Sequence, residues 1–352
     1  MRAVLAARSC NLGTCALGRA IDAYGAPLDD GPPLHGRRVP LVLHAPRPSE
    51  RMAITTPLWT GIRVLDGLLT IGRGARVGIF GAAGSGKSAF VEAIVAGCAA
   101  DAVVVCLVGE RGREAQRWIA MRSDRNTIVC ATSDRPAAER VAAAHVAVTH
   151  ADALRKRGLH VVLVIDSMAR VAAALREIGV AAGESTGRGG YPPSVFAQLA
   201  RLVEVAGEMP AASMTLIATV LADGDDRDPV SEAARSFLDG HIALSTRLAQ
   251  TGKFPAVDVP GSASRTMEFV VGQTHLQAAR RLRRAIGLLD RIDDARALGI
   301  EPVDRAALRA IAAEPRLEGF LRQGRSASDS GATLSQLCEI AALLGDDDDG
   351  DR

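Results

Sequence analysis

The segment of this sequence with the clearest chemical meaning is a glycine-rich run that ends in Lys-Ser. It follows the apolar stretch Val77–Phe80 and precedes a helix-like segment, so it matches the phosphate-loop pattern G-x-x-x-x-G-K-[ST] in a strand-loop-helix setting. Glycines let such a loop curl into a ring of backbone N–H donors at a helix N-terminus, where an anion is favoured. The run therefore predicts binding of a nucleoside triphosphate by Gly81, Ala82, Ala83, Gly84, Ser85, Gly86, Lys87 and Ser88.

Two side chains of this run and one distant carboxylate predict the metal that accompanies the triphosphate. Lys87 can reach the β- and γ-phosphates of ATP, and the short Ser88 hydroxyl can ligate the Mg²⁺ that bridges them. Asp166 follows the apolar run 163–165 at the carboxyl end of a predicted strand, where α/β proteins bind their ligands. We therefore expect ATP and Mg²⁺ as cofactors, with Ser88 and Asp166 holding the metal, Asp166 either directly or through a water.

A charged loop, 109–114 with the sequence GERGRE, follows another apolar run. A carboxylate at a strand end can orient or deprotonate the water that attacks a γ-phosphate, which makes Glu110 the candidate catalytic base. Taken alone, such a loop would ordinarily be interpreted as a solvated charged turn. Only its combination with the motifs described below favours the catalytic interpretation.

The elements that must position these residues are visible as alternating apolar patterns. Strand-like runs at 76–80, 103–109, 127–131, 160–166 and 214–221 alternate with helix-like runs at 87–98, 114–121, 136–154, 171–178 and 194–205. This alternation predicts parallel β-α-β units and a sheet covered by helices on both faces. Beyond about residue 270 the pattern is helical, at 276–292, 305–313 and 333–344. The fold class is therefore α/β with a mainly parallel sheet and a helical C-terminal domain.

Composition restricts the possible partners and the compartment. The 352 residues, 48% hydrophobic and only 3% aromatic, can form one large nucleotide-binding domain with smaller appendages. The 42 basic and 40 acidic residues leave a net charge of +2, which provides no cationic field for nucleic acid. Six cysteines without a C-x-x-C pair indicate free thiols in a reducing cytosol. No apolar stretch approaches ~18 residues, so membrane association is expected only through partner proteins.

Several longer motifs carry a family resemblance, and they lie at 59–69, 108–114, 166–170, 176–184, 190–196, 238–242 and 254–258. Together they resemble the ATPase of type III secretion systems, injectisome or flagellar, a relative of the rotary ATP synthase catalytic subunit. The resemblance extends from about Gly18 to Leu344. It implies a RecA-like P-loop NTPase core, a homohexamer with ATP hydrolysis at subunit interfaces, and use of that energy for protein secretion through chaperone release and substrate unfolding.

The resemblance also assigns site residues beyond those of the phosphate loop. Lys87 and Glu110 match the family's catalytic lysine and glutamate, and Asp166 its metal-associated aspartate. The remaining positions come from the resemblance alone. They are Arg111 and Arg170 near the phosphates, Phe254 where the family places an aromatic ring on adenine, and Arg265 as an arginine finger that reaches the neighbouring subunit's γ-phosphate.

The family pattern also predicts the domain organisation and three departures from it. We expect a remnant of an N-terminal β-barrel domain and linker at 1–55, the ATPase domain at 56–268, a helical domain at 269–345 and an acidic disordered tail at 346–352. Most of the family's barrel precedes the motif that begins here at Gly18. The approach to the finger contains Pro260 and Gly261, which should alter how rigidly it is presented. The loop 184–190, which faces the central pore in the family, is unusually rich in glycine.

The implied partners are further copies of the chain, the stalk and stator proteins of an export apparatus, secretion chaperones and export substrates. The implied location is cytoplasmic, at the inner-membrane face of that apparatus. Two alternatives remain open. One is a truncated, non-catalytic nucleotide-binding scaffold, and the other is a hexameric RNA translocase, for which residues 1–55 supply only one aromatic residue, Tyr24.

Overall fold

The protein divides into two compact units that interleave along the chain. The computed structural model describes residues 9–222, 228–299 and 302–345, and the predicted acidic tail lies outside them. Unit 1 comprises Met1–Ile54, Arg73–Phe80 and Ala100–Asp239, and unit 2 comprises Thr55–Gly72, Gly81–Ala99 and Gly240–Arg352. The domain boundaries expected from the sequence stay predictions.

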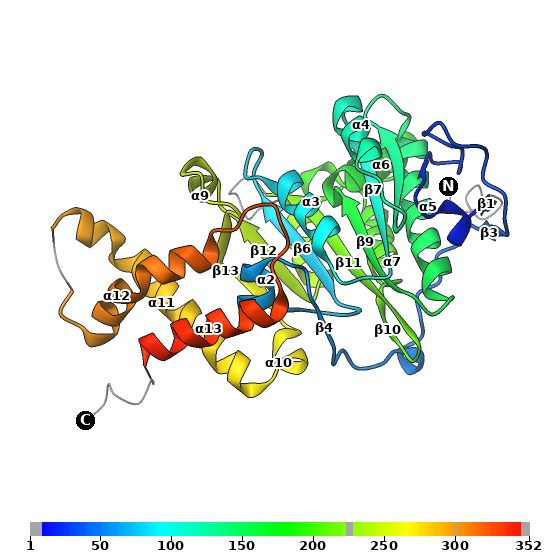
Figure 1. Ribbon diagram of the computed structural model, residues 1–352. Helices are drawn as coiled ribbons and strands as arrows, with labels where there is room; N and C mark the ends of the chain where they lie inside the picture. Colours follow the sequence, from blue (N-terminus) through cyan, green and yellow to red (C-terminus); the bar gives the residue numbers. More distant parts are fainter. Residues whose placement is uncertain (1–8, 223–227, 300–301, 346–352) are drawn as a thin grey trace. The chain divides into compact units, whose positions relative to one another are not determined.

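Unit 1 is built on a mostly parallel sheet whose strand order is β6-β11-β9-β7-β8-β2 (Figure 1). The strands are β6 (Arg76–Gly81, of which 76–80 belong to this unit), β11 (Ala212–Leu221), β9 (His160–Asp166), β7 (Ala102–Glu110), β8 (Asn126–Thr132) and β2 (Ala20–Ile21). β9 pairs in parallel with β11 and β7, and β8 with β7 and β2. The α/β prediction is confirmed, and all five predicted strands form.

Short strands were expected among the loops of residues 1–55, but the sequence patterns gave no bounds for any of the short strands. β2 adds a two-residue edge to the sheet, and β10 (Gly207–Met209) pairs antiparallel with β11. Another antiparallel pair joins β1 (Ser9–Asn11) and β3 (Arg38–Pro40). Strands of two or three residues are too short to display a period-2 pattern, so they formed no recognisable signal in a segment rich in Gly and Pro.

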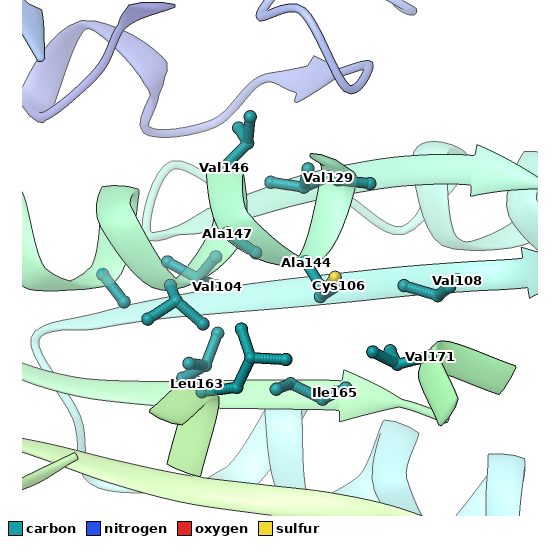
Figure 2. Close-up of a cluster of buried hydrophobic side chains, with 14 of the residues drawn as sticks. Val104, Cys106, Val108, Val129, Ala144, Val146, Ala147, Leu163, Ile165 and Val171 are labelled. Carbon is teal, nitrogen blue, oxygen red and sulfur yellow. The ribbon is translucent and has the colours of Figure 1, made fainter. Parts of the chain in front are cut away.

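Helices of unit 1 cover the sheet and form its core. They are α4 (Gly112–Ala120), α5 (Ala137–Arg155), α6 (Met168–Ala181), α7 (Pro193–Val203) and α8 (Pro229–Phe237), with 3-10 turns at Thr14–Ala16, Pro48–Glu50 and Arg188–Gly190. α5 packs on β7, β8 and β9. Figure 2 shows Ala144 and Ala147 of α5 close to the strand side chains Val104, Cys106 and Val129. Small alanines on the helix let it approach the branched residues of the sheet closely.

Strand β7 is buried on both of its faces. Val104, Cys106 and Val108 belong to the core cluster beneath α5, while the alternate residues Val103, Val105 and Leu107 are equally inaccessible. A strand buried on both faces has apolar residues at consecutive positions, and this continuous apolar run is the pattern that predicted β7.

Unit 2 combines short strand pairs with helices. β4 (Pro57–Leu58) pairs with β5 (Ile71–Gly72), and β12 (Gly240–Leu244) with β13 (Val257–Ser264), both antiparallel. The helices are α2 (Arg63–Leu68), α3 (Lys87–Gly97), α9 (Thr246–Gln250), α10 (Met267–Val270), α11 (Gln273–Ala297), α12 (Arg305–Leu321) and α13 (Ser330–Leu344). The helical pattern predicted α11, α12 and α13, and these three helices pack on one another and on α2.

Helix α12 is longer than the sequence pattern indicated, because it continues through Pro315 to Leu321. A proline removes one backbone hydrogen bond, and we expected the helix to end before it. The turn beyond Pro315 is stabilised by burial of Leu317 and Phe320. Arg63 also donates to the C-terminal carbonyls of Phe320, at 2.9 Å, and Gly319, at 3.0 Å. Tertiary contacts therefore compensate for the lost bond.

None of the six cysteines forms a disulfide, in agreement with the expected free thiols. Among the described residues, no helix combines the length and the apolar character needed to cross a bilayer.

Candidate active site

The predicted phosphate loop lies in unit 2, between the end of β6 and the first residue of α3. Gly84 and Gly86 have φ values of +80° and +89°, a left-handed backbone that glycine adopts without strain. Lys87 Nζ donates to the carbonyls of Gly81, at 2.6 Å, and Ala82, at 2.7 Å, which closes the loop on itself.

The loop has the features that a triphosphate with its Mg²⁺ requires. A Cβ added at Gly84 or Gly86 would meet no described heavy atom within 4 Å, so the space over the loop is open. Ser88 is exposed, and Ser85 Oγ is buried with no hydrogen-bond partner among the described residues. Exposed glycine amides at the start of α3, a lysine and a serine hydroxyl are the donor set that fits Mg-ATP.

In unit 1 the predicted catalytic glutamate is the last residue of β7. Glu110 is 6% exposed, and its Oε1 forms an ion pair with Nη1 of Arg170 on α6. Gly109, with φ +68°, precedes it at an irregularity in the pairing of β7 with β8. A Cβ at Gly109 would lie 3.2 Å from Arg170 Cδ, so the glycine makes room for the arginine stem. The structure thus brings Glu110 and Arg170 together.

A second carboxyl group, Glu114 in the first turn of α4, completes this cluster. Burial by itself would raise the pKa of Glu110, but a hydrogen bond from Glu114 and the charge and hydrogen bond of Arg170 outweigh it, so the pKa is lowered. The same hydrogen bond, with partial desolvation and the charge of Glu110, raises the pKa of Glu114 to about 7. Near neutral pH, Glu110 is therefore ionised while Glu114 holds a proton part of the time.

The predicted metal ligand Asp166 ends the neighbouring strand β9. In the sheet it lies opposite Leu107, three residues before Glu110, so both carboxylates stand at the carboxyl edge of adjacent parallel strands. Asp166 is 8% exposed and accepts a hydrogen bond from Thr219 Oγ1 of β11 at 2.6 Å. The next residue, Ser167, caps α6 by accepting from the Arg170 amide. A buried, oriented carboxylate at this edge fits a metal-associated role.

The three other predicted residues are also located. Arg111 is exposed and forms the N-cap of α4, directly after Glu110. Phe254, in unit 2, is half-buried, and its carbonyl accepts from the Gln323 amide at 2.8 Å. Neither observation tests the proposed contact of Phe254 with adenine.

Arg265, the predicted finger, is exposed at the end of β13 between two anchored hydroxyl residues. Ser264 Oγ donates to the Thr70 carbonyl at 2.6 Å, and Thr266 Oγ1 accepts from the Gly72 amide at 3.1 Å. These bonds fix the backbone on both sides of Arg265 and leave its guanidinium in solvent.

The unusual approach to this arginine is stabilised from within. The Gly261 amide donates to Asp258 Oδ1 at 3.0 Å, and Ser262 Oγ accepts from the Ala243 amide at 2.9 Å. The pairing of β12 with β13 shifts register here, which accommodates the Pro260-Gly261 step as a β-bulge.

Sequence reasoning missed Glu114 and Thr219 as members of the site. Glu114 was visible in the charged loop, and its spacing of four residues from Glu110 is the available signal. Thr219 carried no signal beyond being a polar residue late in an apolar strand, because its contact with Asp166 joins residues 53 positions apart.

Comparisons with known proteins agree with this geometry. Residues 61–264 match the family model described as "ATP synthase alpha/beta family, nucleotide-binding domain". The chain is 41% identical to the Type 3 secretion system ATPase of Xanthomonas euvesicatoria over 345 residues, covering 96% of this chain and 77% of that protein. It is 42% identical to the Flagellum-specific ATP synthase of Treponema pallidum, covering 96% and 78%. The assembled ATPase EscN of enteropathogenic E. coli, solved with its central stalk EscO, superposes with a TM-score of 0.88 at 38% identity, covering 95% and 83%.

Proposed function

Because this chain belongs to the type 3 secretion and flagellar ATPases, within the ATP synthase alpha/beta family, we propose a specific division of labour among its site residues. Membership makes it an enzyme whose ATP hydrolysis energises protein secretion. The residue roles below are proposals. The observation that carries them is the buried Glu110 carboxylate, kept ionised by Arg170 at a strand end.

Residues 81–88 bind the triphosphate. The backbone amides of the loop and the start of α3 hold the phosphate oxygens, and Lys87 neutralises the β- and γ-phosphates. Ser88 and Asp166 hold Mg²⁺, directly or through water, and the ion, when bound, neutralises charge that develops on the phosphates. Phe254 packs on adenine through its ring face.

Glu110 orients the attacking water and takes its proton. Its lowered pKa keeps it available as a base across the physiological range, because a base must be ionised to accept a proton. Arg170 holds the Glu110 carboxylate in place, and Arg111 adds positive charge near the phosphates.

Subunits assemble into a homohexameric ring in which Arg265 completes the neighbouring site. The exposed guanidinium on an anchored backbone suits a group that must reach another molecule. The ring works at the cytoplasmic face of the inner membrane, contacts a central stalk and stator proteins, and releases chaperones from export substrates while it unfolds them. It contacts the membrane only through partner proteins, and no nucleic acid is involved.

The test of the catalytic role is Glu110→Gln, which preserves the size of the side chain but cannot accept a proton. We expect Mg²⁺-dependent phosphate release to fall by ~10³-fold, since a positioned base contributes ~10² to 10⁴ in rate, while Mg-ATP still binds. Glu177→Gln is the matched control, because Glu177 is an exposed carboxylate elsewhere in unit 1. Wild-type turnover in Glu110→Gln would remove this residue from the mechanism. A wild-type protein that binds ATP without hydrolysing it would favour the scaffold alternative.

Mixing inactive subunits tests the role of Arg265. Arg265→Ala should lower kcat by ~10³-fold. In rings that contain both Arg265→Ala and Glu110→Gln subunits, some interfaces combine an intact Glu110 with an intact Arg265 from the next subunit. Partial recovery of activity on mixing is therefore expected, and recovery should be absent if Arg265 acts within its own subunit.

A further inference from the structure

An exposed phenylalanine follows closely after the predicted arginine finger of unit 2. Phe269 is 65% exposed on the short helix α10, four residues after Arg265. Its helix neighbours Met267 and Val270 are only 6% and 7% exposed, and α10 packs on strand β5. These buried neighbours hold the helix against its own unit and leave the Phe269 ring in solvent. A lone exposed apolar side chain is ordinary on a protein surface, so its meaning depends on a surface that can receive it.

Unit 1 contains an apolar hollow at the carboxyl edge of its sheet. The hollow has a volume of about 440 Å³ and is lined by α4, the end of β8 and the loop that follows β2. Its apolar side chains include Tyr24 and Leu28, which are 47% and 40% exposed, and Ala115 and Ile119 of α4. A cavity of roughly 150 Å³ already accepts benzene, so the hollow is wide enough for a phenyl ring.

The hollow lies one strand away from the proposed catalytic base. Thr132, at the end of β8, lines the hollow and is the register partner of Glu110 on β7. Adjacent strands lie about 5 Å apart. Gly112, which also lines the hollow, follows Glu110 by two residues. A neighbouring copy that extends its Arg265 to a phosphate beside Glu110 therefore brings its own surface over this part of unit 1.

The chain between Arg265 and Phe269 is short enough to place the ring there. Four residues span about 6 Å as a helix and at most ~14 Å when extended, so Phe269 must lie within that range of the finger. In a closed ring each copy uses two different surfaces, one toward each neighbour. The surface that carries Arg265 and Phe269 in one copy therefore meets the carboxyl edge of the next copy, where the hollow lies.

We propose that Phe269 anchors the contact between copies of this chain by inserting into the hollow of the next subunit, and so seats Arg265 at that subunit's phosphate. The inference rests on the proposed ring in which Arg265 completes the neighbouring site. Aromatic residues are enriched among the side chains that anchor protein interfaces, and polar and charged side chains complete the lining of the hollow. Phe269 acts through assembly and touches no nucleotide, so it is a positioning residue.

Ring assembly, measured without turnover, tests the anchor. Burial of a phenylalanine ring favours association by about 10- to 100-fold. Phe269→Ala should therefore raise the protein concentration for half-maximal ring formation by ~30-fold, measured by sedimentation velocity with Mg²⁺ and a non-hydrolysable ATP analogue. Phe269→Leu, which keeps an apolar side chain, should retain most of the wild-type assembly. Leu308→Ala is the control, because Leu308 is 50% exposed on α12, elsewhere in unit 2.

Unchanged ring formation in Phe269→Ala would overturn the proposal. Because the Phe269 side chain is mostly exposed, the variant should unfold at the wild-type temperature, which circular dichroism checks. A weaker ring is then a property of the contact between copies.

A double-mutant cycle identifies the hollow as the seat of the ring. Leu28→Ala and Phe269→Ala should each weaken assembly, and the double variant should lose less than the two effects combined, because both substitutions remove the same contact. Ile119→Ala provides a second cycle from the other wall of the hollow. Additive losses in both cycles would place Phe269 against another part of the neighbouring copy and contradict the proposal.

The dependence of turnover on protein concentration separates the anchor from the finger. Phe269→Ala should hydrolyse ATP slowly in dilute solution and approach the wild-type kcat as rings form at high concentration, whereas Arg265→Ala should stay slow throughout. A loss that persists in fully assembled Phe269→Ala rings would contradict an anchoring role. A wild type that forms no ring at any concentration would contradict the proposed ring together with the anchor. Wild-type rings that Phe269→Ala leaves intact would contradict the anchor alone, so the two failures are distinguishable.

Discussion

Two buried carboxyl groups, one in each unit, illustrate how the surroundings of the same chemical group decide its use. Asp66 in unit 2 is 1% exposed and accepts hydrogen bonds from the Thr60 amide, at 2.8 Å, the Thr60 hydroxyl, at 2.7 Å, and the Gly61 amide, at 2.9 Å. Burial outweighs these three neutral donors and raises the pKa of Asp66 to about 6. Glu110 in unit 1 is almost as inaccessible, yet its pKa is lowered.

Asp66 and Glu110 differ in the charge of the groups that contact their carboxyl oxygens. Neutral donors satisfy the oxygens of Asp66 without supplying a full positive charge, so that carboxyl group stabilises a turn. Glu110 has the guanidinium of Arg170 beside it, and this charge together with a hydrogen bond from Glu114 keeps it ionised despite burial. A buried carboxylate becomes a usable base where a cation compensates its desolvation, and remains a structural acceptor where none does.

Removal of the Arg170 guanidinium has the largest expected effect, because it would abolish the difference between Glu110 and Asp66. Without Arg170, the pKa of Glu110 should rise because burial is no longer offset. Arg170→Gln should therefore lower kcat by ~10³-fold and move the acidic limb of the pH profile to higher pH, since a protonated Glu110 cannot act as a base. Arg170→Lys should restore part of the rate. Steady-state kinetics across pH measures both, and an unmoved acidic limb in Arg170→Gln would contradict the assigned partner.

The second prediction concerns the stability that Asp66 supplies to unit 2. Asp66→Ala leaves three buried donors without an acceptor and should lower the free energy of unfolding by about 3 kcal/mol. Asp66→Asn keeps an oxygen for Thr60 and loses the acceptor of Gly61, so about 1 kcal/mol is expected. Urea unfolding of the two variants against the wild type tests the ranking. An equal loss in both would show that the charge of Asp66, rather than its bonds, matters.

The third prediction is the sign of the pH dependence at Asp66. Its folded pKa, about 6, lies above the ordinary value of 3.8, so the folded state binds the proton more tightly than the unfolded chain. The wild type should therefore lose unfolding free energy relative to Asp66→Asn as the pH rises from about 4 to about 6. Urea midpoints at pH 4, 5, 6 and 7 measure this, and a relative gain in that range would reverse the assignment.

The smallest expected effect comes from removing the hydrogen bond that Thr219 donates to Asp166. Thr219→Val removes one hydroxyl donor from a buried position while preserving shape, which should cost about 1 kcal/mol. We expect the Mg²⁺ concentration for half-maximal activity to rise about fivefold with little change in kcat at saturating Mg²⁺. Thr251→Val, at an exposed position of unit 2, is the control. An unchanged Mg²⁺ requirement would separate Asp166 from the metal.

Most of the fold was predictable because its signals are local. The strands buried on both faces and the ten-residue helices between them repeat patterns that the sequence displays directly, and the phosphate loop is one contiguous run. The two-residue strand β2 and residues 314–321 of α12 were not located from the sequence, and the reason is shared. Each is held by contacts with residues far away in the sequence, such as Arg63 with Phe320, and a local pattern cannot record them.

The amino-acid sequence by itself determined that this chain binds a nucleoside triphosphate, because the phosphate-loop motif is a contiguous run of residues. It also determined which carboxylates stand at strand ends, because each follows directly after an apolar run. Only the tertiary structure decided which carboxyl is ionised. The ionisation of Glu110 depends on Arg170 and Glu114, which reach it from separate helices, and on burial, which exists only once the sheet and its helices have packed.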